Sequence, residues 1–291
     1  MSSSNGKKRL IINADDFGWS RGITDGILLA HREGPVTSAS LMVHQAASEY
    51  ALALTGRYPH LSVGVHLNLC AGTPVLPPDQ VPSLVDRDGK FYPFAQLHRR
   101  LLRWQVCSSE MEAEFRAQIQ WMTHRGFPPT HADSHHHIHI YPSAALAFRR
   151  AVRAEGIRCA RGYRLRHWLD RGISGLPFLG PAPRKWLLWA YAELLHALVF
   201  RGILQVHSSV VVHPKYRWRL DCLREAWSHT FANLAPGAYD LGCHPGLSEP
   251  GFSESDPLRE LRERELEALT HRGLRLDLDR SGIQLITYAD L

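Results

Sequence analysis

Short strand-like apolar runs alternate with helical patterns along this chain of 291 residues. Residues 9–13 form such a run, and residues 61–69 place apolar side chains at every second position, the period of a half-buried strand. Between them, residues 22–31 carry apolar side chains near helical spacing, with Gly34 as a suitable stop. Because strands that alternate with helices form βαβ units, this pattern predicts a parallel sheet. Further strands are expected at residues 37–43, 206–212, 239–243 and 283–287.

Polar residues follow several of these runs, and their position favours a parallel barrel over an open parallel sheet. Asp15 and Asp16 follow the first run, and His244 follows residues 239–243. In a parallel barrel, functional side chains collect at the carboxyl ends of the strands. We therefore predict an α/β fold, a distorted (β/α) barrel with parallel strands and an active site at their carboxyl ends. An open doubly wound sheet is the alternative, but the first run lacks the G-x-G-x-x-G of a dinucleotide site.

Two later patterns predict helices. Ser109 and Glu112 have the spacing of a capping box, so a helix is expected from there to Gly126. Residues 257–272 are charged, with leucines at amphipathic spacing, and indicate a second helix.

The chain length fits a single barrel domain. We expect one domain over residues 1–291, with a flexible N-terminus at residues 1–7 and a divergent insertion at about residues 161–236. Residues 72–93 are rich in proline and are expected to form a long surface loop.

Charge and cysteine content limit the class of protein. The net charge of +6 indicates a mildly basic surface. The sequence contains no dense Lys/Arg run with interleaved aromatics, so it does not indicate a nucleic-acid partner. The five cysteines are scattered without a C-x-x-C pair, which argues against a disulfide scaffold or a thiolate zinc site. The N-terminus lacks the apolar core of a signal peptide, and residues 186–200 are too short to span a bilayer. A cytoplasmic location is expected.

The sequence Asn-Ala-Asp-Asp-Phe-Gly at residues 13–18 contains two adjacent carboxylates. Neighbouring carboxylates repel each other when both are ionised, so such a pair indicates a cation or a shared proton. Successive side chains of a strand point to opposite faces, but a bent strand end can turn Asp15 and Asp16 into one cleft. The alternative is that the pair caps the following helix.

Five histidines and one aspartate lie within nine residues at 131–139. Imidazole is a common metal ligand, and it needs a partner that fixes its tautomer. Asp133 and Ser134 are placed to be such partners, whereas apolar flanks disfavour a mere histidine tract. His131 has no assigned role beyond support or substrate contact. If the segment is extended, one face carries His135, His137 and His139, and the other carries His136.

His66 lies within the alternating run at 61–69, on the same face as Asn68. Alone, it would be interpreted as a satisfied core histidine. His244 is a candidate proton donor or further ligand. Together with the aspartate pair and the histidine cluster, these residues supply one carboxylate and several imidazoles for a divalent ion, with a carboxylate to spare.

That set of groups predicts hydrolysis of an amide or an ester. A bound metal ion acidifies water, the spare aspartate accepts a proton, and a histidine protonates the leaving group. Two other interpretations remain open: a non-haem iron oxygenase, which also uses two histidines and a carboxylate, and a metal- or sugar-binding protein without turnover.

These motifs, in this order, resemble those of the YdjC/ChbG carbohydrate deacetylases. The matching segments are residues 13–18, 37–40, 64–67, 133–139 and 243–245. The resemblance implies a distorted barrel that removes an N-acetyl group from an amino sugar with one divalent ion, Zn²⁺ or Mg²⁺. By that resemblance the metal ligands are Asp16, His66 and His135, the catalytic base is Asp15, and the acid is His244.

The resemblance leaves the substrate open between a chito-oligosaccharide and an N-acetylglucosaminyl lipid of the hopanoid-associated branch. Residues 186–200, with basic residues on both sides, fit either weak contact with a membrane surface or a buried core helix. The expected partner is a small-molecule amino sugar or glycolipid; a homodimer is left open.

Overall fold

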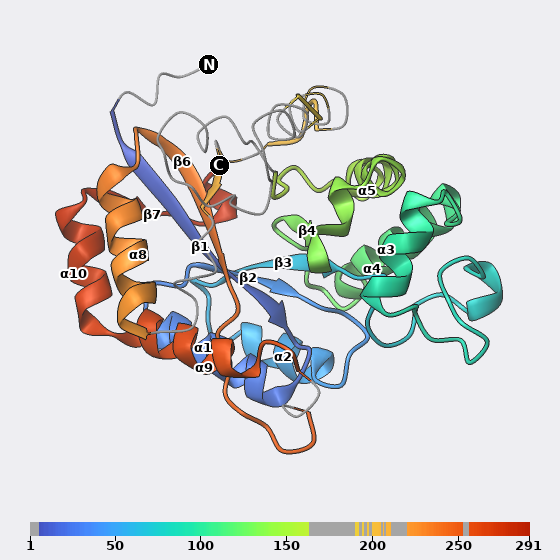
Figure 1. Ribbon diagram of the computed structural model, residues 1–291, viewed down its shortest axis with the longest axis horizontal. Coiled ribbons are helices and arrows are strands. Elements are labelled where there is room, and N and C mark those ends of the chain that lie inside the picture. Colours follow the sequence, from blue (N-terminus) through green and yellow to red (C-terminus); the bar gives the residue numbers. More distant parts are fainter. Residues whose placement is uncertain are drawn as a thin grey trace.

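A computed structural model describes residues 6–162, 200–204, 206, 208–210, 220–252 and 256–291, together with Ala190, Tyr191, Leu194 and Ala197. Within this part of the chain, parallel strands form one sheet (Figure 1). The strands are β1 Lys8–Phe17, β2 Ser38–Leu41, β3 Ser62–Leu67, β4 Ala132–Ser134, β5 Ser208–Val210, β6 Gly237–Cys243 and β7 Ile283–Leu285.

The sheet is curled, and β1 is its central strand, paired with β2, β6 and β7. Its order is β4-β3-β2-β1-β6-β5, and β7 pairs with the first residues of β1. Beyond β4 the parallel pairing continues through the bridges Ala132↔Ala160 and Cys159↔Leu204, and Leu204 comes shortly before β5 in the chain. The α/β prediction with a distorted barrel of parallel strands is therefore confirmed.

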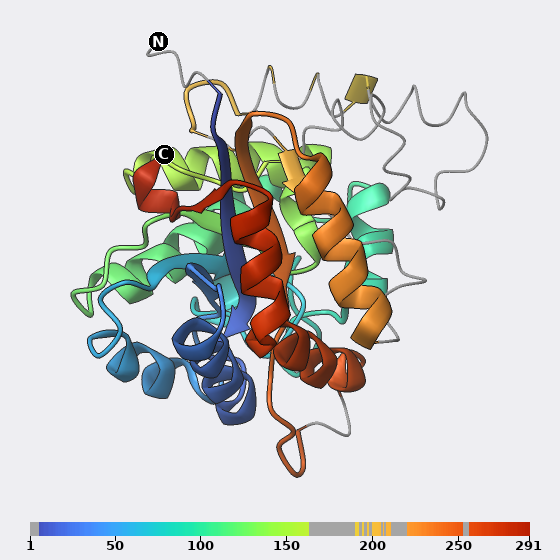
Figure 2. The same cartoon turned by 90° about the vertical axis from the view of Figure 1, so that its left-hand side faces the viewer.

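Helices cover the convex face of the curled sheet (Figures 1 and 2). Helices α1, α8, α9 and α10 lie outside β1 and β6, and α4 and α5 pack together outside β3 and β4. The helix bounds are α1 Arg21–Glu33, α2 Ser48–Thr55, α3 Phe94–Leu102, α4 Ser108–Thr123, α5 Pro142–Ala154, α8 Leu220–Asn233, α9 Arg259–Thr270 and α10 Arg272–Arg280. None of the helices in the described ranges is long and apolar enough to cross a membrane.

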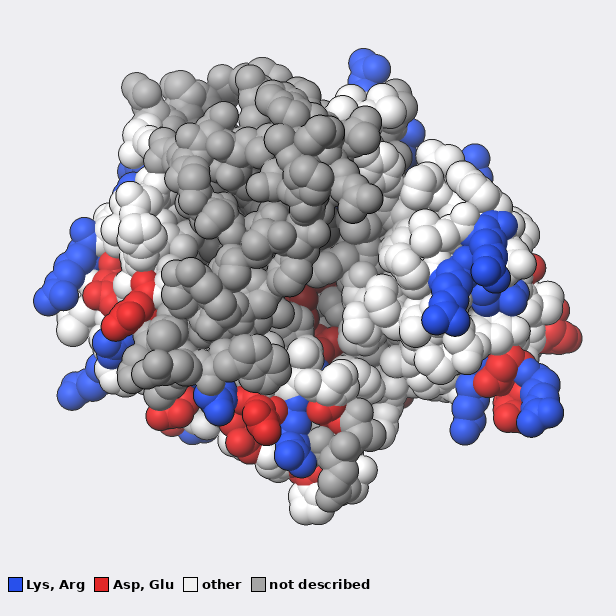
Figure 3. All heavy atoms as spheres, viewed as in Figure 1, with Lys and Arg blue, Asp and Glu red and all other residues white. Residues whose placement is uncertain are grey.

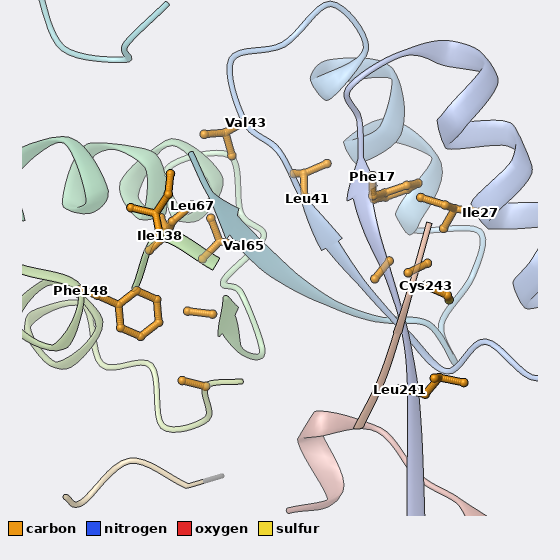
Figure 4. Packing of buried hydrophobic residues seen from close by; sticks show 14 of the residues in the cluster. Phe17, Ile27, Leu41, Val43, Val65, Leu67, Ile138, Phe148, Leu241 and Cys243 are labelled. Carbon is orange, nitrogen blue, oxygen red and sulfur yellow. The ribbon is translucent and has the colours of Figure 1, made fainter. Parts of the chain in front are cut away.

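The strand period of two sorts the side chains onto the two faces of the sheet. In β1, Leu10, Ile12 and Ala14 belong to the main hydrophobic core under the helices, whereas Ile11 belongs to a smaller cluster on the concave face. Figure 4 shows Phe17 facing Ile27 of α1, and Val65 and Leu67 packing near Ile138 and Phe148. Buried polar residues occupy alternate positions of the strands, and His131 lies directly before β4: Asn13, Asp15, Ser40, His66, His131, Asp133 and Asp240.

The predicted elements were largely correct in kind and shifted in their bounds. The helix expected from Ser109 begins at Ser108 after Cys107, which makes no side-chain cap, and it ends at Thr123 rather than Gly126. The predicted helix at 257–272 is confirmed as α9 and is followed directly by α10. Most of residues 163–199, including the greater part of 186–200, lies outside the described residues.

Candidate metal centre and active site

Asp16 departs from the alternation of β1, and this departure creates the site. Its φ of 68° lies in the left-handed region, which aspartate tolerates better than most residues. The register of β1 against β2 shifts between Ala14 and Phe17, as at a β-bulge. The side chains of Asp15 and Asp16 therefore both lie on the concave side, where they contact Arg161 and His135 respectively. The side chain of Phe17 packs in the core under the helices. The strand end thus delivers two consecutive carboxylates to one place.

Three side chains from three strand ends converge there. Asp16 Oδ1 lies 3.0 Å from His135 Nδ1 and 3.4 Å from His66 Nε2. All three residues are buried, and their ligating atoms lie within 4.8 Å of one another. Since β1, β3 and β4 are parallel, their carboxyl ends meet at the same end of the sheet. The three residues that the resemblance marked as metal ligands therefore do come together.

His66 is held in the orientation that a metal ligand requires. Its Nδ1 lies 2.7 Å from Asp133 Oδ1, so Nδ1 carries a proton and Nε2 faces Asp16. Asp133 is held in turn by Ser40, which donates to Oδ2 at 2.9 Å. His66 and Asp133 are direct partners across β3 and β4. This supports the interpretation of Asp133 as a group that orients a histidine. The histidine is His66 of β3, not one of the cluster at residues 131–139.

The residues present fit a divalent cation at this point. Asp16 Oδ1 is buried and accepts no hydrogen bond, although two imidazole nitrogens face it. Buried carboxylates also gather at this point, where a cation would stabilise them. They are Asp15, Asp16 and Asp133, and the buried guanidiniums beside them are Arg161 and Arg262. One oxygen and two nitrogen donors match the preferences of zinc better than the oxygen shell of magnesium.

Arg161 is a central cation of the site that the sequence did not reveal. It donates to both oxygens of Asp15, at 2.6 and 2.8 Å, and lies 2.9 Å from Asp133 Oδ2 and 2.6 Å from Asp240 Oδ2. Burial raises the pKa of Asp15, but the Arg161 guanidinium outweighs it and holds that pKa below its ordinary value. No motif surrounds Arg161; the one available signal was that several buried carboxylates need a buried cation.

Arg262 is the second missed cation. From α9 it donates to Asp16 Oδ2 at 2.8 Å and to Asp256 Oδ2 at 2.5 Å, and its guanidinium lies over Trp19. Burial raises the pKa of Asp16, but Arg262 and His135 outweigh it and keep that pKa well below the ordinary value. Asp16 is therefore ionised, with Oδ2 fixed by Arg262 and Oδ1 directed at the two histidines.

His244 comes from the end of β6 and is partly exposed. Its Nε2 lies 3.8 Å from Asp15 Oδ2, and its Nδ1 lies 3.8 Å from Glu265 Oε2. Its backbone N–H donates to the same Glu265 oxygen at 2.5 Å. The side chain thus stands between the spare carboxylate of the centre and a glutamate of α9. In Figure 3, acidic side chains are visible at the bottom of a hollow near the middle of the face shown.

The predicted alternation within the histidine cluster was wrong. Residues His135–Ile140 form a short helical segment in which His136 and His137 have φ of 51° and 55°. Both are exposed residues, whereas His139 is buried, stacks on Phe148 and contacts Ser134. Extended periodicity does not apply because the strand ends at Ser134.

His131 and Asn68 have structural roles in the fold. His131 stacks on Tyr288 and contacts Ser40 and Thr130; burial lowers its pKa to about 3, so it stays neutral. Gly64 of β3 lies against that ring: a Cβ at this position would be 2.5 Å from it. This explains why the residue is a glycine. Asn68, expected on the face of His66, instead accepts from the backbone N–H of Cys70 and Ala71.

Comparison with known proteins gives consistent matches. The sequence profile of YdjC-like proteins matches residues 9–280. A carbohydrate deacetylase of Halalkalibacterium halodurans is 38% identical over 219 residues, covering 70% of this chain and 90% of that protein. A carbohydrate deacetylase of Vibrio vulnificus is 28% identical and covers 97% of this chain and 96% of its own length. A crystal structure from Enterococcus faecalis, of a protein named for cellobiose-phosphate cleavage, superposes with a TM-score of 0.77 at 25% identity, covering 98% of both chains.

Proposed function

The chain belongs to the YdjC-like protein family, and on that basis we propose that it hydrolyses the N-acetyl group of an acetylated amino sugar. Water adds to the acetyl carbon, the carbon–nitrogen bond breaks, and the products are acetate and the free amine. The observation that supports this most is the convergence of Asp16, His66 and His135, together with a second carboxylate, Asp15, that has an oxygen within 4.8 Å of a nitrogen of His66.

Asp16, His66 and His135 would hold one divalent ion in this proposal. When bound, such an ion supplies a Lewis acid that lowers the pKa of water and polarises a carbonyl. Asp133 would keep the His66 ring oriented, and Arg262 would keep Asp16 ionised. Zinc is the ion that this set of donors favours.

Asp15 is the proposed catalytic base. It is ionised, and it is not one of the three proposed ligands, so it can accept the proton of the attacking water. Arg161 donates to both oxygens of Asp15 and so holds the carboxylate in one orientation. The same contact lowers the pKa of Asp15 and makes it a weaker base. A carboxylate whose pKa is lowered is a weak base at equilibrium, so its position beside the activated water matters more than its affinity for protons.

His244 is the proposed acid. Its Nε2 faces the same space as Asp15, and Glu265 lies on the opposite side of the ring. A proton on Nε2 can pass to the departing nitrogen, which leaves as an amine rather than as an unstable anion. Glu265 would orient the ring and stabilise the charged imidazole before that transfer.

The substrate class is tested by measuring acetate release from N-acetylglucosamine oligomers and from an N-acetylglucosaminyl lipid, each with and without a chelator. Acetate that disappears with chelator and returns with added zinc supports the proposal, and the better substrate identifies the branch. Release that persists in chelator would contradict the metal-dependent mechanism. If neither substrate yields acetate while one metal ion stays bound, the site acts on another acylated substrate or only binds.

A further inference from the structure

Cys70 lies beside the histidines of the site, although its sequence position gave no sign of it. It follows β3 closely, and His136 follows β4; because these strands pair, the two side chains emerge at neighbouring strand ends. The Cys70 sulfur and one nitrogen each of His135 and His136 lie within 4.8 Å of one another. The three atoms are therefore close enough to one another for a single ion to contact all of them.

The backbone at Cys70 and the rings of His135 and His136 are held in place by their surroundings. The backbone N–H of Cys70 donates to Asn68 Oδ1 at 3.0 Å, which fixes the turn after β3. His136 has a φ of 51° and stacks on Phe94, with ring centroids 4.2 Å apart. The rings of His135 and His136 have centroids 4.3 Å apart. A site that is organised before the ligand arrives loses little conformational entropy on binding.

We propose that Cys70, His135 and His136 form a second metal site, specific for thiophilic ions, that shares His135 with the centre of Asp16 and His66. One sulfur and two imidazole donors suit cadmium or excess zinc and do not suit magnesium or calcium. Binding breaks the S–H bond of Cys70, forms a sulfur–metal bond and releases the proton to the solvent. His136 is exposed, so an ion can reach the site from the solvent.

Sharing His135 makes this second site inhibitory. An ion bound by Cys70 and His136 competes for the ring that the first centre needs, or it places a second positive charge next to it. The enzyme would therefore lose activity as the second site fills. This consequence rests on the proposed function, whereas the existence of the site does not.

The test is a titration of the full-length, zinc-loaded protein with Cd²⁺, followed by the ultraviolet charge-transfer absorption of a thiolate–cadmium bond. Cadmium in the centre of Asp16 and His66 contributes no such band, because that centre has no sulfur ligand. We expect the band in the wild type, its loss in Cys70→Ser, and weaker Cd²⁺ binding in His136→Ala. Cys107→Ser is the matched control, because Cys107 is an exposed cysteine at the start of α4 and belongs to none of the metal-binding groups found among the described residues; it should keep the band.

Two outcomes would overturn the proposal: no band in the wild type, or an equal band in Cys70→Ser. The activity arm compares Cd²⁺ inhibition, each variant relative to its own uninhibited rate, and Cys70→Ser should lose the inhibition that Cys107→Ser retains. If no substrate is turned over at all, the proposed function fails, while the absorption band still decides whether the second site exists.

Discussion

Arg161 donates two hydrogen bonds to Asp15, from Nη1 to Oδ2 at 2.6 Å and from Nη2 to Oδ1 at 2.8 Å. The same guanidinium contacts Asp133, whose other oxygen holds the ring of His66. One buried side chain therefore joins the proposed base to the support of a proposed metal ligand. Arg161 and Asp15 are each 2% exposed, so water cannot replace either partner when the other is removed.

Arg161→Met should destabilise the protein strongly, by about 3–5 kcal/mol, because it leaves buried carboxylates without their cation. Arg161→Lys keeps the charge but loses the fork that holds both oxygens of Asp15, so activity should fall further than stability. Denaturant unfolding and kcat/KM measure the two effects. Arg158→Lys, an exposed arginine nearby, is the control and should change neither. Wild-type activity in Arg161→Lys would contradict the positioning role.

Asp15→Asn should retain its metal ion and lose nearly all turnover. The amide cannot accept the proton of the attacking water, and loss of a general base typically lowers kcat by about 10²–10⁴-fold. Metal content by elemental analysis and acetate release by a coupled assay are measured on the same sample. Asp88→Asn, at an exposed carboxylate, serves as the control. If Asp15→Asn turns over at the wild-type rate, another group is the base.

Metal affinity should rise with pH, because a proton must leave His66 before its Nε2 can bind an ion. Burial alone would lower the pKa of His66, but Asp133 and Asp16 raise it from 6.5 to about 10 in the metal-free protein. Below that pH, binding must displace one proton, so the apparent Kd should fall about tenfold per pH unit. Calorimetry in two buffers of different ionisation enthalpy counts the released protons. Binding that releases none near neutral pH would contradict the assignment of His66.

The same shift has a consequence for stability, with the opposite dependence on pH. Because folding raises the pKa of His66, the stabilisation is complete below about pH 6.5 and disappears as the pH rises through about 10. In the metal-free protein, His66→Gln should therefore cost more stability near the lower pH than near the upper one. His60→Gln, at an exposed histidine, should show no such difference.

Two histidines of one short segment should respond in opposite ways to replacement by alanine. His135→Ala removes a proposed ligand, so metal affinity should fall by more than the roughly 10–100-fold typical of losing an outer partner. His139→Ala leaves a cavity against Phe148 and should cost about 2 kcal/mol or more of stability while metal binding persists. Metal content and thermal unfolding of both variants check this. A stable, metal-free His139→Ala variant would reverse the two assignments.

The local sequence determined the fold class and much of the site. The apolar run at residues 9–13 predicted β1, and the period of two at residues 61–69 predicted β3. A strand alternates faces whatever it pairs with, so the local sequence also determines which side chains lie on the concave side. Parallel pairing then brings the residues after each apolar run to one end of the sheet. That is why Asp15, His66 and His244 could be named as neighbours before their contacts were known.

Tertiary structure alone decided which groups balance the charges and how the ends of the strands turn. Arg161 meets Asp15 across 146 residues and Arg262 meets Asp16 across 246, and contacts at such separations leave no local pattern. The left-handed φ of Asp16 and of His136 is imposed by packing at the strand ends, where the period of the strand no longer applies. The sequence determined which residues could reach the site, and the packing of distant segments determined their orientation and charge.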